Sequence, residues 1–256
     1  MKNTEIIEII ERRFPLYTQE SYDNSGLILE GGFETSGVYC ALDLTVEVVD
    51  AAYKNGCNMI VVHHPSIFRP VKCLTENKNA ALIKAASHCM TVYAGHTTVD
   101  IGVGGINDKL VELFKINNTE SLTDNGIGRI GEIESTTLEN LAGEESVKLN
   151  DTHVKTVGDL NKRITRVAIC GGGGSGEDMI DCAVKKGADV YITGEVKHHE
   201  ALYAKNVNLA MIVFGHFESE IVFNELMVEY IDKNTNGRIK VVADKVQTSP
   251  FNKETV

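Results

Sequence analysis

Runs of apolar, β-branched residues alternate along the chain with segments whose apolar positions recur at helical spacing. In the first half, three runs have the character of buried strands: GVYCALDL, CNMIVVHH and TVYAGHT. Two helical patterns separate them: TVEVVDAAYKNG and NKNAALIKAASHCM. The same order recurs later as RVAICGG, GEDMIDCAVKKG, ADVYITG, HHEALYAKN and LAMIVFG. Strands that alternate with helices in this way predict α/β units with largely parallel sheets.

The two halves also match residue by residue. Residues 51–64 align with 182–195, and GHTTVD at 95–100 aligns with GHFESE at 215–220. We therefore predict an α/β fold of two similar domains related by internal duplication, each a sheet flanked by helices. The more polar stretch 115–160 reads as a connector, which gives a first domain at 1–125 and a second at 126–237. Residues 238–250 read as one more strand, which could return to the first sheet.

Composition and charge narrow the class of protein. With 256 residues, 43% hydrophobic and 24% charged, the chain is typical of globular proteins. A net charge of −11 argues against non-specific electrostatic binding of nucleic acid. The longest apolar run is too short to cross a bilayer, and the N-terminal segment suits an amphipathic helix instead of a signal peptide. These features favour the cytoplasm, and six cysteines without a CxxC pair predict free thiols.

Histidines and carboxylates gather where three apolar strands end. Each cluster follows a predicted strand: His63 and His64, His96 with Asp100, and His216 with Glu220. Ligands of open α/β sheets bind at this carboxyl edge. A single histidine there is usually a hydrogen-bonded loop residue, but three clusters at matched places favour a metal site. The GHxxx(D/E) spacing lets the imidazole and the carboxylate converge in a helix or in an extended segment.

The number of candidate ligands exceeds what one four-coordinate ion takes. We therefore predict two divalent ions, with Zn, Mn and Fe all compatible with imidazole and carboxylate donors. The predicted ligands are His63, His64, Asp100, His216 and Glu220, with His96 in reserve.

Three further segments are less specific. His198 and His199 fit a solvated helix start or a group that supports the site or the substrate. The glycines of CGGGGSGEDMID fit a phosphate cradle or a tight turn, and SYDNSGL reads mainly as a chain reversal.

Six motifs, in order, make the chain resemble the GTP cyclohydrolase I type 2 family, also called Nif-three-like or YbgI-like proteins. They are YDNSGL, ALDLT, HHPSIF, HTTVDIGVGGIND, TGEVKHHEAL and GHFESE. The resemblance implies a dinuclear metal centre held by the five ligands above, with the glutamate bridging and His96 nearby, and a ring-shaped homohexamer. The chain departs from the family where Tyr22 replaces a usual Trp and HTTVD replaces HTNLD. Its length implies the form without an inserted middle domain.

The resemblance also implies an activity. We expect a metal-dependent hydrolase of a small molecule, with GTP as the candidate substrate and ring opening with formate release as the reaction. Three histidines are the candidate proton carriers: His96, His198 and His199. Two alternatives stay open, namely hydrolysis of another substrate such as a phosphoester or cyclic amide, and a non-catalytic metal-binding scaffold or regulatory protein.

Overall fold

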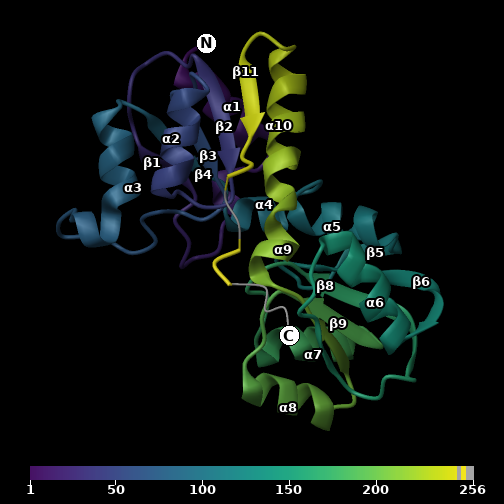
Figure 1. The fold of residues 1–256 in the computed structure, drawn as a ribbon. Coiled ribbons are helices and arrows are strands. Elements are labelled where there is room, and N and C mark those ends of the chain that lie inside the picture. Colours follow the sequence, from purple (N-terminus) through teal and green to yellow (C-terminus); the bar gives the residue numbers. More distant parts are fainter. Residues whose placement is uncertain (247–248, 252–256) are drawn as a thin grey trace. The chain divides into compact units, whose positions relative to one another are not determined.

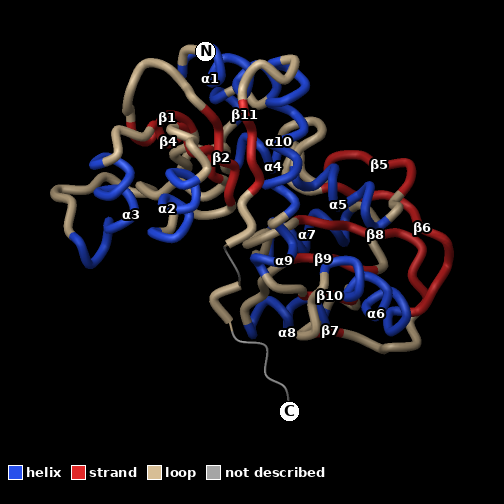
Figure 2. Tube along the Cα trace, turned by 45° about the horizontal axis from the view of Figure 1, so that its top comes forward, coloured by secondary structure: helices blue, strands red, loops and turns tan. Residues whose placement is uncertain are grey.

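The chain folds into two compact units, each with its own β-sheet (Figures 1 and 2). The structure is a computed structural model that describes residues 1–246 and 249–251. The first unit contains 1–105 and the described residues from 221 to 246, and the second contains 106–220 and 249–251. Helices pack on both sheets, so the predicted α/β fold with two similar domains is confirmed.

The first sheet has the strand order β1-β4-β3-β2-β11, and only the edge strand β1 runs antiparallel to its neighbour. Its strands are β1 (Gly26–Leu29), β2 (Gly37–Ala41), β3 (Met59–Val62), β4 (Thr91–Ala94) and β11 (Lys240–Ala243). The helical segments of this unit are α1 (Asn3–Arg13), η1 (Leu16–Thr18), α2 (Val46–Lys54), α3 (Glu76–Ser87), α4 (Thr97–Ile101) and α10 (Val222–Thr235).

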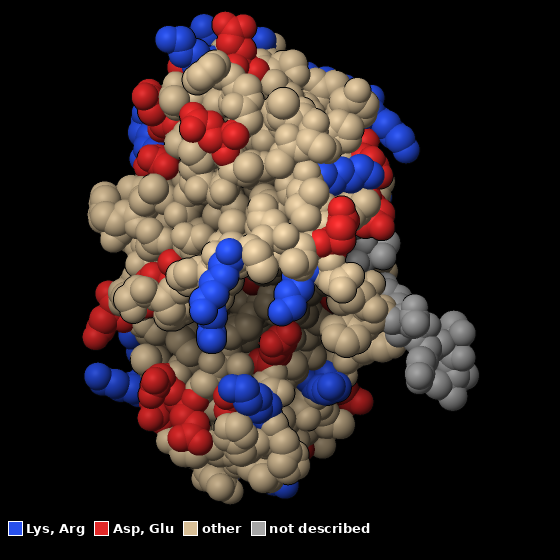
Figure 3. Space-filling model, turned by 90° about the vertical axis from the view of Figure 1, so that its left-hand side faces the viewer, with Lys and Arg blue, Asp and Glu red and all other residues tan. Residues whose placement is uncertain are grey.

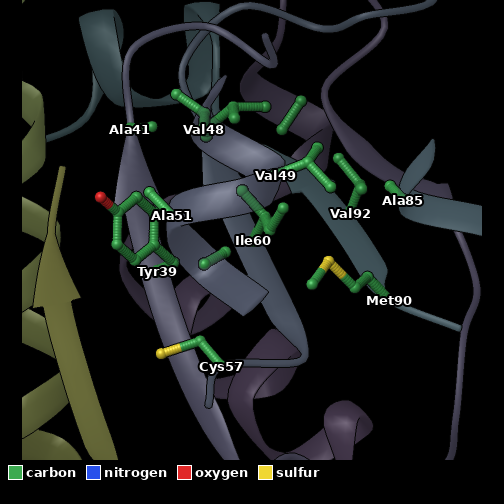
Figure 4. Close-up of a cluster of buried hydrophobic side chains, with 13 residues drawn as sticks. Tyr39, Ala41, Val48, Val49, Ala51, Cys57, Ile60, Ala85, Met90 and Val92 are labelled. Atoms are coloured by element: carbon green, nitrogen blue, oxygen red, sulfur yellow. The ribbon is translucent and has the colours of Figure 1, made fainter. Parts of the chain in front are cut away.

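The three central strands of this sheet are buried at every position. Alternate residues, among them Tyr39, Ile60 and Val92, pack with α2 and α3 in one apolar cluster (Figure 4). The residues between them, such as Val38 and Cys40, are equally buried. Burial on both faces explains the continuous apolar runs in the sequence. Each large apolar side chain removed from water adds about 1.5–3 kcal/mol to stability.

The second sheet has the order β5-β6-β8-β9-β10-β7, in which β8, β9 and β10 are parallel and the flanking strands antiparallel. Its strands are β5 (Asn117–Ser121), β6 (Arg129–Thr137), β7 (Lys155–Val157), β8 (Arg163–Cys170), β9 (Val190–Thr193) and β10 (Ala210–Val213). Its helices are α5 (Ile106–Phe114), α6 (Leu138–Leu149), α7 (Glu177–Lys185), α8 (His198–Asn206) and α9 (His216–Glu220).

The central strands of the two sheets repeat one another in register. In each sheet three parallel strands end side by side, at Ala41, Val62 and Ala94 in the first and at Cys170, Thr193 and Val213 in the second. A short helix follows the third strand in both repeats, α4 in one and α9 in the other. The duplication seen in the sequence is therefore present in the backbone.

The helix that follows each repeat packs on the sheet of the other. Helix α5 comes after α4 along the chain but contacts β6 and β8, whereas α10 comes after α9 but contacts β2 and β11. Figure 1 shows α10 beside β11. The two repeats thus exchange equivalent helices.

This exchange moves the division between the units away from the predicted boundaries. The boundaries at 125 and 237 put α5 in the first domain and α10 in the second, whereas the structure divides the chain after Gly105 and after Glu220. An amphipathic pattern predicts that one helix face is buried, but not which sheet buries it. Within the closing stretch 238–250, β11 pairs in parallel with β2, and residues 247 and 248 lie outside the described part.

Charges of both signs share the molecular surface. On the face in Figure 3, Lys and Arg side chains are interspersed with Asp and Glu. None of the described helices combines the length and the apolar character needed to cross a lipid bilayer.

One carboxyl group in the second unit is buried on the inner side of a helix. The Glu145 side chain on α6 is only 2% exposed, and Lys148 Nζ lies 3.0 Å from its Oε1. Burial raises the pKa of Glu145 to about 7, although Lys148 lowers it in part. The folded protein therefore keeps a proton here that the unfolded chain releases between about pH 4.5 and 7.

We predict that Glu145→Gln stabilises the protein at pH 8 but not at pH 5. The native protein loses stability as pH rises from about 4.5 to 7, because only its unfolded state ionises in that window. The neutral amide removes this cost, which is about 1–3 kcal/mol at pH 8. Thermal unfolding at both pH values measures it, with the exposed Glu134→Gln on β6 as control. An equal shift of Glu145→Gln at both pH values would contradict the prediction.

Candidate metal centre

The carboxyl end of β3 carries two adjacent histidines. The backbone N–H groups of His63 and His64 both donate to Leu42 O, each at 3.0 Å, so the chain turns here instead of continuing as a strand. This turn brings the two rings to a centroid distance of 4.8 Å. On an ideal strand they would point to opposite faces. The chain therefore turns immediately before Pro65.

The Nδ1 atoms of both rings are held by oxygen acceptors. His63 is fully buried, and its Nδ1 lies 2.9 Å from the carbonyl oxygen of Gly95. His64 Nδ1 lies 2.7 Å from Asp43 Oδ1. A carbonyl or carboxylate oxygen only accepts, so Nδ1 carries the proton in each ring. The lone pair of the neutral imidazole is then on Nε2, the atom that a metal ion would bind.

His96 is oriented in the same manner from another segment. Its Nδ1 lies 2.7 Å from Asp23 Oδ1, and the Thr97 N–H donates to Asp23 Oδ2 at 3.1 Å. Ser25 Oγ also donates to this carboxylate at 2.7 Å. Although burial acts to raise it, the hydrogen bonds from His96 and Thr97 hold the pKa of Asp23 well below its usual range. Asp23 is thus a carboxylate that fixes the His96 ring.

The three histidines form one cluster within the first unit. His63, His64 and His96 each offer a ring nitrogen, and these atoms lie within 4.8 Å of one another. Asp100 on α4 adds a carboxylate, with Oδ1 3.7 Å from His63 Nε2. Imidazole nitrogens with a carboxylate oxygen suit Zn, Mn or Fe. The donors therefore fit a divalent transition metal.

The second unit places a histidine and two carboxylates together. His216 Nε2 lies 2.9 Å from Glu220 Oε2, four residues further along α9, and its Nδ1 lies 3.0 Å from Glu195 Oε1. Glu220 is 4% exposed. A ring held by one carboxylate and facing another is a common arrangement around metal ions. The predicted pairing of His216 with Glu220 is thus present in the geometry of this unit.

The glycine-rich stretch after β8 makes room for Glu220. Gly172 has φ +59°, and a Cβ on it would lie 1.6 Å from Glu220 Oε1. Its N–H donates to Ser219 Oγ at 2.9 Å, and that hydroxyl donates to His216 O at 2.9 Å. Close approach of the backbone to the Glu220 side chain on α9 therefore favours glycine here. Neither a phosphate cradle nor a simple turn accounts for this contact.

His198 and His199 lie at the exposed start of α8. His198 lines a cavity of about 660 Å³ whose other walls include Val157, Lys162 and Leu202. A second cavity of about 520 Å³ is lined by His216, Glu195 and Lys197. Among the described residues, neither His198 nor His199 belongs to a group of metal-type donors.

Sequence reasoning missed the residues that orient the imidazoles. Asp43 and Glu195 each come two residues after the end of a buried parallel strand, which is the same signal that pointed to His64. Asp23 lies in a segment that reads as a chain reversal, and its role appears only once the fold brings it to His96.

Comparison with known proteins identifies the family of this chain. The model of the Duf34/NIF3 (NGG1p interacting factor 3) family matches residues 1–250. The chain belongs to the Duf34/NIF3 family. A Streptococcus pneumoniae relative named GTP cyclohydrolase 1 type 2 homolog is 34% identical over 98% of this chain and 99% of its own.

Solved structures show the same NIF3 fold. The Staphylococcus aureus hypothetical protein SA1388 superposes with a TM-score of 0.92 and 31% identity, covering 99% of both chains. A protein described as ybgI, of unknown function, gives a TM-score of 0.87 at 24% identity, covering 97% of this chain and 99% of its own. The resemblance inferred from the six motifs is confirmed.

We predict that Asp43→Asn weakens zinc binding by this NIF3 protein about tenfold, because the carboxylate that orients His64 is lost. Competition with a chromophoric chelator measures the affinity. The control is Asp50→Asn, which removes an aspartate of α2 that pairs with Lys84 of α3. This variant should leave the affinity unchanged. Equal affinities of the two variants would show that Asp43 does not position a ligand.

Gly172→Ala should lower stability by more than Gly187→Ala. Both glycines have positive φ, +59° and +74°, but a Cβ at Gly187 meets no atom within 4 Å. Backbone strain of about 1 kcal/mol is therefore common to both, and only Gly172→Ala adds the clash with Glu220. The difference in unfolding temperature isolates the clash. Equal temperatures would mean that Glu220 does not need this space.

Proposed function

We propose that this NIF3 protein is a dinuclear metal-dependent hydrolase of a small molecule. One observation carries the proposal: His63, His64 and His96 all have Nδ1 fixed by an acceptor and bring ring nitrogens within 4.8 Å of one another. Three imidazoles oriented alike in a partly open cluster suit metal binding better than packing.

We propose that five side chains would hold two divalent ions: His63, His64, Asp100, His216 and Glu220. Five donors suit two ions better than one four-coordinate ion. When bound, such ions lower the pKa of water and stabilise negative charge that develops during hydrolysis. The hydrogen bonds to Nδ1 would keep the ring nitrogens of the histidines in place during the reaction.

We propose His96 as the residue that moves protons during the reaction. It is hydrogen-bonded to a carboxylate and lies beside His63 and His64, with 19% of its side chain exposed. Such a ring can accept a proton while Asp23 stabilises the charge. His198 and His199 are the weaker candidates, because they lie on an exposed helix start.

GTP is the proposed substrate, and opening of its imidazole ring with release of formate is the proposed reaction. The support is the name of the relatives, GTP cyclohydrolase 1 type 2 homolog. Following the family resemblance, we also propose that the protein works as a cytoplasmic homohexamer.

We predict about two bound divalent ions per chain in the purified protein, as expected for a dinuclear site. Glu220→Gln and His64→Ala should each lose at least one ion and the hydrolysis of GTP, whereas His198→Ala should keep both ions. Elemental analysis gives the stoichiometry, and formate release reports the reaction. One ion per chain would reject the dinuclear site, and full occupancy without formate release from GTP would reject the substrate.

A further inference from the structure

Two exposed aromatic side chains stand beside the histidine cluster of the first unit. Tyr22 and Phe68 have ring centroids 6.3 Å apart and planes inclined at 51°. Phe68 also meets the His96 ring edge-on, at 6.0 Å and 85°. We call Tyr22 and Phe68 the aromatic corner. It is continuous with the proposed metal ligands through His96.

The corner is open to a ligand and fixed in place. Tyr22 is 60% exposed and Phe68 42% exposed, so ring faces remain uncovered. Asn24 Nδ2 donates to Ile67 O at 2.5 Å, which ties the segment before Phe68 to the turn that contains Asp23. Since Asp23 holds His96, one short stretch positions both the corner and the histidine.

Two cations follow Phe68 in the same irregular segment between β3 and α3. Arg69 and Lys72 are exposed, and neither pairs with an acidic side chain in the described part of the chain. In a protein of net charge −11, two such cations in the segment that follows Phe68 are available for an anionic ligand.

We propose that this segment, together with Tyr22, binds a nucleotide: a planar heteroaromatic ring that carries an anionic group. Because the two rings form a corner and not a slot, the ligand ring stacks on one face and meets the edge of the other. Arg69 and Lys72 attract the phosphates. The assignment rests on the proposed function, since the ring bound here lies next to His96, and it names the residues that select the substrate.

Binding of three probes separates the two parts of this site. GTP, guanosine and inorganic tripolyphosphate are titrated calorimetrically into the metal-loaded full-length protein. Phe68→Leu should weaken GTP and guanosine about five- to tenfold, as expected from loss of one stacked base, and leave tripolyphosphate unchanged. Arg69→Gln should weaken GTP and tripolyphosphate about threefold at low salt, and leave guanosine unchanged.

Matched substitutions elsewhere in the first unit serve as controls. Phe33→Leu removes another exposed ring, 84% exposed, and Lys233→Gln removes another exposed cation. Both should bind all three probes as the unmodified protein does. The proposal is overturned if Phe68→Leu and Phe33→Leu bind alike, if GTP does not bind at all, or if Phe68→Leu only lowers the oligomer mass in light scattering, which would make the corner a subunit contact.

These measurements read binding and not turnover. The expected pattern of affinities without formate release would reject the proposed reaction and keep the nucleotide site. Formate release with equal affinities for every variant would keep the reaction and reject the aromatic corner.

Discussion

The hydrogen bond to Nδ1 of each clustered histidine is the constraint on which the candidate site depends. A free imidazole can carry its proton on either nitrogen and can rotate about its side chain. Here Gly95 O, Asp43 and Asp23 each fix one ring, so the nitrogen lone pairs have set directions before any ion arrives. The three acceptors come from three separate segments. The donor set is therefore a product of the fold and not of a local motif.

The exchange of helices gives the two carboxylates proposed as metal ligands their position in the chain. Asp100 lies on α4 and Glu220 on α9, and each helix precedes the point where the chain passes to the sheet of the other repeat. Each of these two helices is preceded by a buried strand of one sheet and followed by a helix packed on the other. Anchorage on both sides limits how far these short helices, of five residues each, can shift or unwind.

The sequence was most informative where burial leaves a strong pattern. The strands β2, β3, β8 and β10 follow from their apolar runs, and the matched His63, His96 and His216 follow from the ends of such runs. The exchange of α5 and α10 was not predictable, because helix amphipathicity is the same whichever sheet is covered. The role of Asp23 was also hidden, since a hydrogen bond over 73 residues leaves no periodic signal.

The two repeats have diverged in complementary ways at equivalent positions. Two residues beyond the end of the first strand, one repeat has Asp43, which orients His64, and the other has Gly172, which leaves space for Glu220. Two residues beyond the second strand, the imidazole of His64 corresponds to the carboxylate of Glu195, which orients His216. In the first repeat carboxylates hold both His64 and His96, whereas in the second repeat Glu195 holds His216. A second aspartate at position 172 would occupy the volume of Glu220, so the histidine-rich and the glutamate-containing halves cannot simply be interchanged.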